Sequence, residues 1–392
     1  MARQVKKTDM EEREDLYSRR CINSIMMLPN VPNTITKGIP TFHTNIVAIL
    51  IAVSSWTTTS AACEQFGIPG AIDIVLNEVT AIRQATMLVW TVGTPIVMVF
   101  GTFGNIMILL IQRREYSASH SSMSVFFTCL AISDLTSLWF DPFFWWLEAL
   151  NVFVYYSLLW KIRVFATYVT GHMSPSILVT MTTQKAVSIL WPHKVNIVFT
   201  TGFAKTLMSG LLAFFVILNS HLLYGFTVIL PSNISVVTCY DSFVNIEYAV
   251  FFFNIWGWVD TFFSSLGPVA LLLVSNSVLM WRVGQSLQEA RKRFSAGNTD
   301  QLRAREKKTS SMTVMLIATS VTFLLLTSPL SVYVTFRETF LEEAYRDQYI
   351  ADVNDLLLAV FHLLWMVNNA VTFYLYCLTG AKYRQKFWRS SV

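Results

Sequence analysis

The chain has 392 residues, of which 54% are hydrophobic and 14% are charged, and its net charge is +5. Its mean hydropathy of +0.49 is too high for a set of soluble globular domains. The apolar runs reach about 20 residues, enough to cross a bilayer as helices, and their continuous character excludes a β-barrel. The composition therefore predicts an all-α, multi-pass membrane protein.

The N-terminal part carries no regular pattern until a short apolar run. Residues 1–42 are polar and charged, which predicts disorder. The run Asn45 to Val53 is too short to span a membrane, and small residues follow it just before Cys63. This pattern fits a signal-peptide core if translation begins near Met27, and it fits equally an apolar patch in a long ectodomain.

Seven longer apolar stretches follow, and each predicts a membrane-spanning helix. We expect these spans at 86–112, 122–147, 158–190, 204–229, 250–283, 309–336 and 352–378. Pro268 and Pro329 lie inside the fifth and sixth spans, where neighbouring helices can satisfy the carbonyl groups that proline leaves unbonded. The predicted organisation is an N-terminal segment at 1–85 with a candidate signal peptide near 26–62, a bundle at 86–378, and a tail at 379–392 that forms an amphipathic helix.

Basic residues cluster in two places and set the predicted orientation. One cluster lies between Arg282 and Lys308, and the other between Lys382 and Arg389. Both are expected in the cytoplasm, which with seven spans puts the N-terminus outside the cell. The glycosylation sequon at Asn233 follows span four, and this orientation places it outside as well. We expect a multi-pass plasma-membrane protein, and nucleic acid is not a predicted partner because topology explains the basic clusters.

Asp134 is a carboxylate deep inside the second apolar stretch. A carboxylate facing hydrocarbon costs on the order of several kcal/mol, so it must face protein or water within a helical bundle. Polar residues at similar depth in other spans are Asn105, Ser174, Asn368 and Asn369. The sequence predicts that these residues meet Asp134 at one interior site.

The same stretches carry a family resemblance. The chain resembles rhodopsin-class G-protein-coupled receptors in four places. These are the Gly-Asn pair that ends at Asn105, the LAxxD pattern that ends at Asp134, Ser174 in the third span, and a seventh span that ends YCLTGAKYRQKFW. Within that class the chain resembles the FMRFamide-type neuropeptide receptors of invertebrates. The resemblance covers roughly 86–388 and implies an outward-facing ligand pocket and a cytoplasmic G-protein face.

The resemblance also assigns roles to interior residues. The polar cluster around Asp134 resembles a sodium-binding pocket, and loss of the ion on activation would couple the pocket to helix rearrangement. The alternative is a hydrogen-bond network with a neutral Asp134. Phe323 and Pro329 are bend and packing elements by resemblance, and Pro268 matches a family proline in span five.

Two activation motifs depart from the family pattern. Gln184, Lys185 and Ala186 stand where the family has an acid, arginine and tyrosine, and Lys185 lacks the planar fork of arginine. Thr372 to Tyr376 replaces Asn-Pro-x-x-Tyr and keeps the tyrosine. The residues expected at the G-protein face are Gln184, Lys185, Asn276, Lys307, Lys308 and Tyr376. The departures leave open a non-coupling or decoy receptor.

The cysteines depart from the family as well. Trp160 stands where the family has a cysteine at the outer end of span three, and Cys239 matches the place of its partner. A Cys63–Cys239 bridge and a free thiol at each position both remain open. Cys129 and Cys377 are expected to be packing residues within helices.

The ligand class follows from charge and from absences. Met366 stands where opsins carry the retinal lysine, and Thr167 stands where monoamine receptors carry an aspartate, so both readings are disfavoured. Segments 225–260 and 337–355 hold nine acids and two bases, which suits a basic or amidated peptide beside aromatic walls. The candidate ligand-binding residues are Trp145, Trp146, Thr167, Asp241, Glu247, Asp260 and Glu342. The alternative is a solvated acidic face with an interfacial aromatic belt.

Two other classes of protein are disfavoured. His172, His221 and His362 lie in spans without a metal motif such as HExxH, so we expect packing or local hydrogen bonding and no enzyme. An odd number of spans, no repeat between the halves and a single deeply buried carboxylate argue against a transporter.

Overall fold

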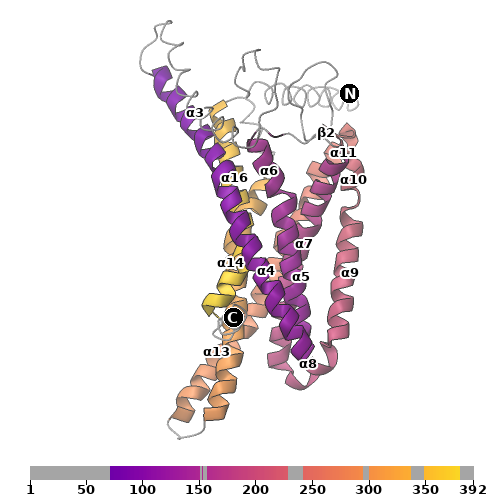
Figure 1. Ribbon diagram of the computed structural model, residues 1–392, viewed down its shortest axis with the longest axis vertical. Coiled ribbons are helices and arrows are strands. Elements are labelled where there is room, and N and C mark those ends of the chain that lie inside the picture. The colour runs from indigo at the N-terminus through magenta and orange to yellow at the C-terminus, as the bar shows by residue number, and fades with distance from the viewer. Residues whose placement is uncertain are drawn as a thin grey trace, which may run out of the picture. The chain divides into compact units, whose positions relative to one another are not determined.

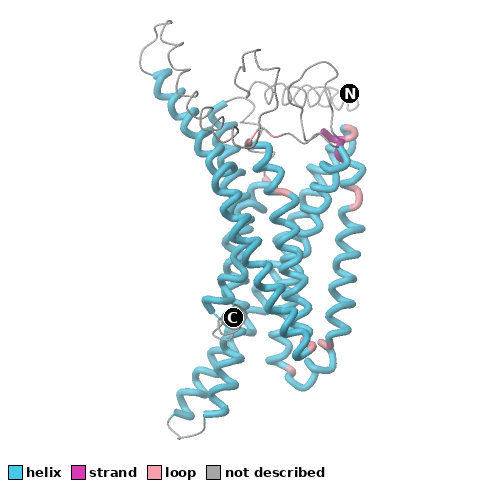
Figure 2. Tube along the Cα trace, viewed as in Figure 1, coloured by secondary structure: helices cyan, strands magenta, loops and turns pink. Residues whose placement is uncertain are grey.

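The computed structural model describes residues 71–150, 152, 157–227, 242–294, 300–336 and 348–379, and nearly all of them are helical (Figure 2). The strands among the described residues are β1 (Phe226–Thr227) and β2 (Ser242–Phe243), which pair antiparallel. Contacts divide the chain into Met1–Ala81 with Leu230–Cys239, and Ile82–Ile229 with Tyr240–Val392. The second unit holds the helical bundle. In the first, the described residues are the start of one helix.

Seven helical segments correspond to the seven predicted spans, so the predicted seven-helix bundle is confirmed (Figure 1). The first segment consists of α3 (Ala71–Leu88), the π turn η2 (Val89–Gly93) and α4 (Thr94–Ser119), and the second of α5 (Ser122–Phe140) and α6 (Pro142–Ala149). The third consists of α7 (Ser157–Leu190) and α8 (Pro192–Val198), and the fourth of α9 (Thr201–Asn219) and α10 (Leu222–Gly225). The fifth segment consists of α11 (Ile246–Phe251), η3 (Phe252–Trp256), α12 (Gly257–Thr261), η4 (Phe262–Leu266) and α13 (Gly267–Phe294). The sixth is α14 (Asp300–Thr335), and the seventh is α16 (Gln348–Thr379).

Figure 1 shows α6 and α10 at one end of the bundle and α8 at the other. We call these the α6 end and the α8 end. Within the described residues, six of the seven segments are long and apolar enough to cross a membrane by themselves, and α7 is not among them. Because α7 packs against α5, α9 and α13, protein rather than lipid can satisfy its polar side chains.

Some predicted boundaries are wrong. The first span was expected from residue 86, but helix already begins at Ala71 and continues through η2, so the expected N-terminal segment 1–85 overlaps it. The sixth helix begins at Asp300 rather than near 309. The predicted amphipathic helix at 379–392 and the candidate signal peptide lie outside the described residues.

Prolines shape three of the helices. Pro175 lies inside α7 and Pro329 inside α14. Pro268 is the second residue of α13 and follows the π turn η4. A proline lacks the backbone N–H and its ring collides with the carbonyl four residues back, and a π turn accommodates such a mismatch. Glycine at 267 avoids a tight contact there, because an added Cβ would lie 3.0 Å from the Phe262 carbonyl oxygen.

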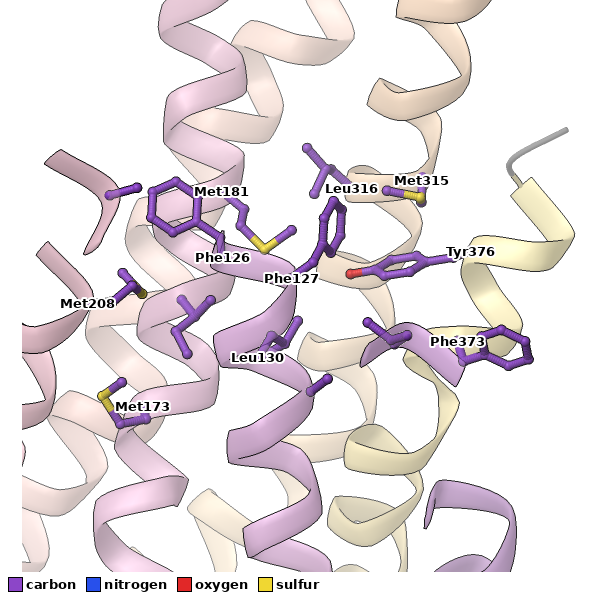
Figure 3. Close-up of a cluster of buried hydrophobic side chains, with 14 of the residues drawn as sticks. Phe126, Phe127, Leu130, Met173, Met181, Met208, Met315, Leu316, Phe373 and Tyr376 are labelled. Carbon is purple, nitrogen blue, oxygen red and sulfur yellow. The ribbon is translucent and has the colours of Figure 1, made fainter. Parts of the chain in front are cut away.

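The buried residues of the main hydrophobic core come from six of the helical segments (Figure 3). Phe126 and Phe127 on α5 are buried there, and the Phe127 ring meets Tyr376 of α16 edge to face at 5.1 Å. Cys129 and Cys377 pack against this core, as expected for packing residues. In a bilayer such packing stabilises helix association through close van der Waals contact, since lipid is as apolar as the side chains.

Candidate functional site

Polar residues from four helical segments gather inside the bundle, and we call Asn105, Asp134, Ser174, Asn369 and Thr372 the polar hub. Asp134 is only 2% exposed, and the Ser174 hydroxyl donates to its Oδ1 at 2.5 Å. The Thr372 side chain also interacts with this carboxyl group. Nδ2 of Asn105 donates to the backbone oxygen of Asn369 at 2.9 Å. The hub therefore joins α4, α5, α7 and α16.

Small residues on α4 make this meeting possible. A Cβ added at Gly101 would lie 2.8 Å from the Cβ of Ala370 and 2.5 Å from Leu138, so only glycine lets α4 approach both neighbours. Asn105 follows one turn later and thereby reaches the α16 backbone. Gly101 thus positions the amide of the hub.

The hub differs from the predicted cluster by the exchange of one residue. Asn368 is half-buried and makes no hydrogen bond to the described residues, whereas Thr372 takes its place. Thr372 stands where the family has the asparagine of its seventh-span motif, and this correspondence could have predicted that its side chain faces the polar hub. Oδ1 of Asn105 and Nδ2 of Asn369 are buried without a partner in the described part of the chain.

A second buried polar site lies at the α6 end, and we call Asp141, Arg163 and His362 the Asp141 triad. Asp141 is the residue between α5 and α6. Nε and Nη2 of Arg163 on α7 donate to its Oδ1 at 3.2 and 3.1 Å. Nε2 of His362 on α16 lies 2.7 Å from its Oδ2. The carboxylate therefore ties three helical segments together.

Aromatic rings surround the triad. The Arg163 guanidinium lies 4.4 Å from the ring centre of Trp160 and 5.2 Å from that of Trp145, within the range of cation–π attraction. Trp90 stacks on Trp145 at 5.2 Å and also contacts His362. Arg163 is only 3% exposed, so its charge is satisfied by Asp141 and these rings rather than by water.

The triad corrects two predictions. Asp134 was expected to be the single deeply buried carboxylate, but Asp141 and Asp352 are buried too. His362 was expected to pack or to form a local hydrogen bond, and instead it contacts the carboxylate of Asp141, which lies 221 residues away in the chain. The signal was present in the sequence, because a charged residue such as Arg163 within a span needs a partner for the same reason as Asp134.

His172 of α7 forms a third polar contact. Its Nε2 lies 2.9 Å from Oδ1 of Asp260 on α12, and its Nδ1 lies 3.2 Å from Nδ2 of Asn219 on α9. The ring is fully buried and is contacted by Phe215 and Trp256. His221 likewise contacts another segment, with its Nδ1 2.7 Å from the Tyr248 hydroxyl. Both histidines connect helical segments instead of only filling space.

At the α8 end, Lys205 of α9 lies 5.3 Å from the ring centre of Tyr116 on α4, and the contacts of α7 with its neighbours are neutral hydrogen bonds. Nε2 of Gln184 donates to the hydroxyl of Ser122 on α5 at 2.8 Å, and Thr183 contacts Ser275 of α13 at 3.2 Å. Lys185 is half-buried and forms no ion pair with the residues that the structure describes. Of the other residues predicted for the G-protein face, Asn276 and Tyr376 are buried, and Lys307 and Lys308 lie on α14.

The predicted ligand-binding residues do not form one cluster of contacts. Asp260 is paired with His172, and the Thr167 hydroxyl donates to the backbone oxygen of Arg163 on its own helix. Trp145 packs on the triad, whereas Trp146 donates to the backbone of Thr91. Glu247 is exposed in the first turn of α11. Asp241 and Glu342 lie outside the described residues, as do Asn233, Cys63 and Cys239.

The predicted bend elements lie in separate surroundings. Phe323 of α14 is buried against Leu178 of α7 and Leu272 of α13, so it touches both neighbours at once. Pro268 follows η4, and Pro329 lines a crevice between α14 and α16. Among the described residues no group of three or more His, Cys, Asp or Glu side chains is placed to hold a metal ion.

The bundle and its shared interior polar residues define a helical, multi-pass membrane protein. The family described as "7 transmembrane receptor (rhodopsin family)" matches residues 104–376, which is more than half of the chain. The chain therefore belongs to the rhodopsin family of seven-transmembrane receptors, a family of receptors and not of enzymes. Among curated proteins, none matches it.

Proposed function

We propose that this receptor sits in the plasma membrane, binds an extracellular peptide at the α6 end, and passes the signal to a heterotrimeric G protein at the α8 end. The observation that carries the proposal is the polar hub, which links α4, α5, α7 and α16 through Asp134 and Asn105. A shared polar cluster of this kind has discrete hydrogen-bonded arrangements, so ligand binding at one end can bias the other.

Charge at the α6 end supports a cationic peptide, though fewer acids contribute than the sequence implied. Asp260 is paired with His172, and Asp352 with Arg83 at 2.9 Å. Both carboxylates therefore already have a partner within the protein and are less available to a ligand. The exposed Glu247 and the acids outside the described residues, Glu342 among them, remain to attract a basic ligand.

The α8 end supports a mobile coupling face. The Gln184–Ser122 hydrogen bond joins two neutral groups, and such a bond contributes about 0.5–1.5 kcal/mol, against about 1.5–3 for one to a charged group. If α14 moves outward by bending at Phe323, Lys185 and Tyr376 become exposed, and a G-protein helix would bind there.

The hub also supports a bound sodium ion. The Asp134 carboxylate has the hydroxyls of Ser174 and Thr372 beside it, and these are oxygen donors of the kind that hard cations take. A cation beside Asp134 would offset the cost of burying its charge. Sodium-dependent thermal stability that disappears in Asp134→Asn would support this site.

A non-coupling receptor is the second candidate. Lys185 stands in place of the family's arginine and has no ion pair in the described part of the chain, and no proline follows Thr372. Without the planar guanidinium, the coupling face loses a bidentate group.

The deciding experiment is a second-messenger screen of cells that display the chain against a library of amidated peptides, with a variant starting at Met27 in parallel. We expect a response to basic members of the library that Glu247→Gln weakens. Ser277→Ala, which removes an exposed hydroxyl on α13 far along the chain from α11, serves as the matched control. No response from a chain detected at the surface would favour the non-coupling receptor.

A further inference from the structure

A crevice of about 470 Å³ lies between α14 and α16. These two helices run side by side in the bundle (Figure 1). The crevice is lined by Ser328, Pro329, Val332, Tyr333, Leu357 and Phe361. Its volume falls in the range of small-molecule sites, which runs from about 300 to 1,000 Å³.

The walls of the crevice are hydrocarbon, although two of the lining residues have hydroxyl groups. The Ser328 hydroxyl donates to the backbone oxygen of Leu324 on its own helix at 2.5 Å. The Tyr333 hydroxyl donates to the backbone oxygen of Asn354 at 3.2 Å. Because both hydroxyls are satisfied within the protein, no convergent polar group is available to orient a polar ligand or a peptide.

The crevice opens to the surface of the bundle at membrane depth. Both α14 and α16 contain stretches long and apolar enough to cross a bilayer. On the α14 side of the crevice Val332 is 57% exposed, and on the α16 side Leu357 is 38% exposed. The molecules that meet such a surface in a membrane are lipids, whose chains are as apolar as these walls.

We propose that this crevice binds one acyl chain of a membrane phospholipid at a fixed position, beyond the peptide and G-protein sites proposed above. A concave apolar wall surrounds a chain on several sides, whereas the convex face of a helix touches it on one, so dispersion contacts favour the crevice. Pro329 removes one backbone hydrogen bond from α14 at this level, so a chain wedged there would restrain the angle between α14 and α16.

The test uses the full chain in lipid nanodiscs that contain phosphatidylcholine with a photoactivatable group along one acyl chain. Cross-links are mapped by mass spectrometry. We expect the label at Val332, Leu357 and Phe361 several-fold more often than at Leu325, which is 68% exposed on the same helix but does not line the crevice.

Val332→Trp fills the crevice from α14 and Leu357→Trp fills it from α16, so each should reduce the label at Phe361 several-fold. Leu325→Trp is the matched control and should leave it unchanged. Two variants on different helices keep the test decisive if one does not fold. Equal labelling of Leu325 and Val332, or labelling of Phe361 that survives both tryptophans, would show only the general lipid layer and overturn the proposal.

Discussion

The two ends of the bundle are held together by different chemistry. At the α6 end the Asp141 triad joins three helical segments through buried charges enclosed by aromatic rings. At the α8 end, Gln184 and Ser122 make a neutral hydrogen bond, and Lys185 has no ion pair among the described residues. The comparison suggests a rigid end that shapes a ligand site and a softer end that can open.

The largest expected effect comes from breaking the triad. Arg163→Met leaves His362 as the partner of the buried Asp141 carboxylate and removes its permanent positive charge, and loss of one partner of a buried ion pair costs about 3–5 kcal/mol. Thermal unfolding in detergent should therefore shift strongly downward. The double variant Arg163→Met, Asp141→Asn leaves no unpaired charge and should recover part of the loss. Equal melting of the single variant and the wild type would refute the triad's structural role.

The second effect concerns the polar hub. Asp134→Asn removes the buried charge but keeps the shape, so the fold should persist and the stability gained from sodium should disappear. Melting is to be measured in sodium and in choline salts at equal ionic strength. Thr136→Ala, at a half-buried position on the same helix whose hydroxyl donates only to the backbone oxygen of Ile132, is the control. Sodium dependence retained in Asp134→Asn would place any ion elsewhere.

The third effect is local opening of the α8 end. Gln184→Ala removes one neutral hydrogen bond, so protection against hydrogen exchange near Ser122 should fall by about 1 kcal/mol. Protection around Asp141 should not change, because the two sites are at opposite ends. A loss spread evenly over both ends would contradict the proposed difference between them.

The smallest effect is electrostatic. Glu247→Gln should leave unfolding unchanged, because the side chain is exposed, and should weaken the response to a basic peptide from the screen. The difference between wild type and variant should shrink at high salt, since exposed charges are screened. An unchanged dose–response curve at low salt would remove Glu247 from the ligand site.

The sequence was most informative where a physical rule admits one answer. Apolar length predicted all seven helices, although α7 alone does not reach the apolar character of a membrane span, and the cost of burying Asp134 predicted polar partners at its depth. The same rule applied to Arg163 and Asp141 predicts a second site, but charge alone does not say which residues meet. That choice depends on how each helix is rotated, as Thr372 in place of Asn368 and His172 beside Asp260 show.

The ligand assignment was less predictable for a related reason. Counting acids cannot separate a free carboxylate from one that a histidine or arginine already binds, and Asp260 and Asp352 belong to the second kind. The helix start at Ala71 was missed because the residues before 86 are only moderately apolar.

The most direct test of the account is guanine-nucleotide exchange on a panel of purified heterotrimeric G proteins, catalysed by the full-length chain in nanodiscs. If the α8 end opens as we propose, at least one G protein should exchange faster with the chain than without it, and faster still with Gln184→Ala. If neither the wild-type chain nor Gln184→Ala accelerates nucleotide exchange on any G protein of the panel, coupling is contradicted, and the chain is a receptor that binds a ligand without transmitting a signal.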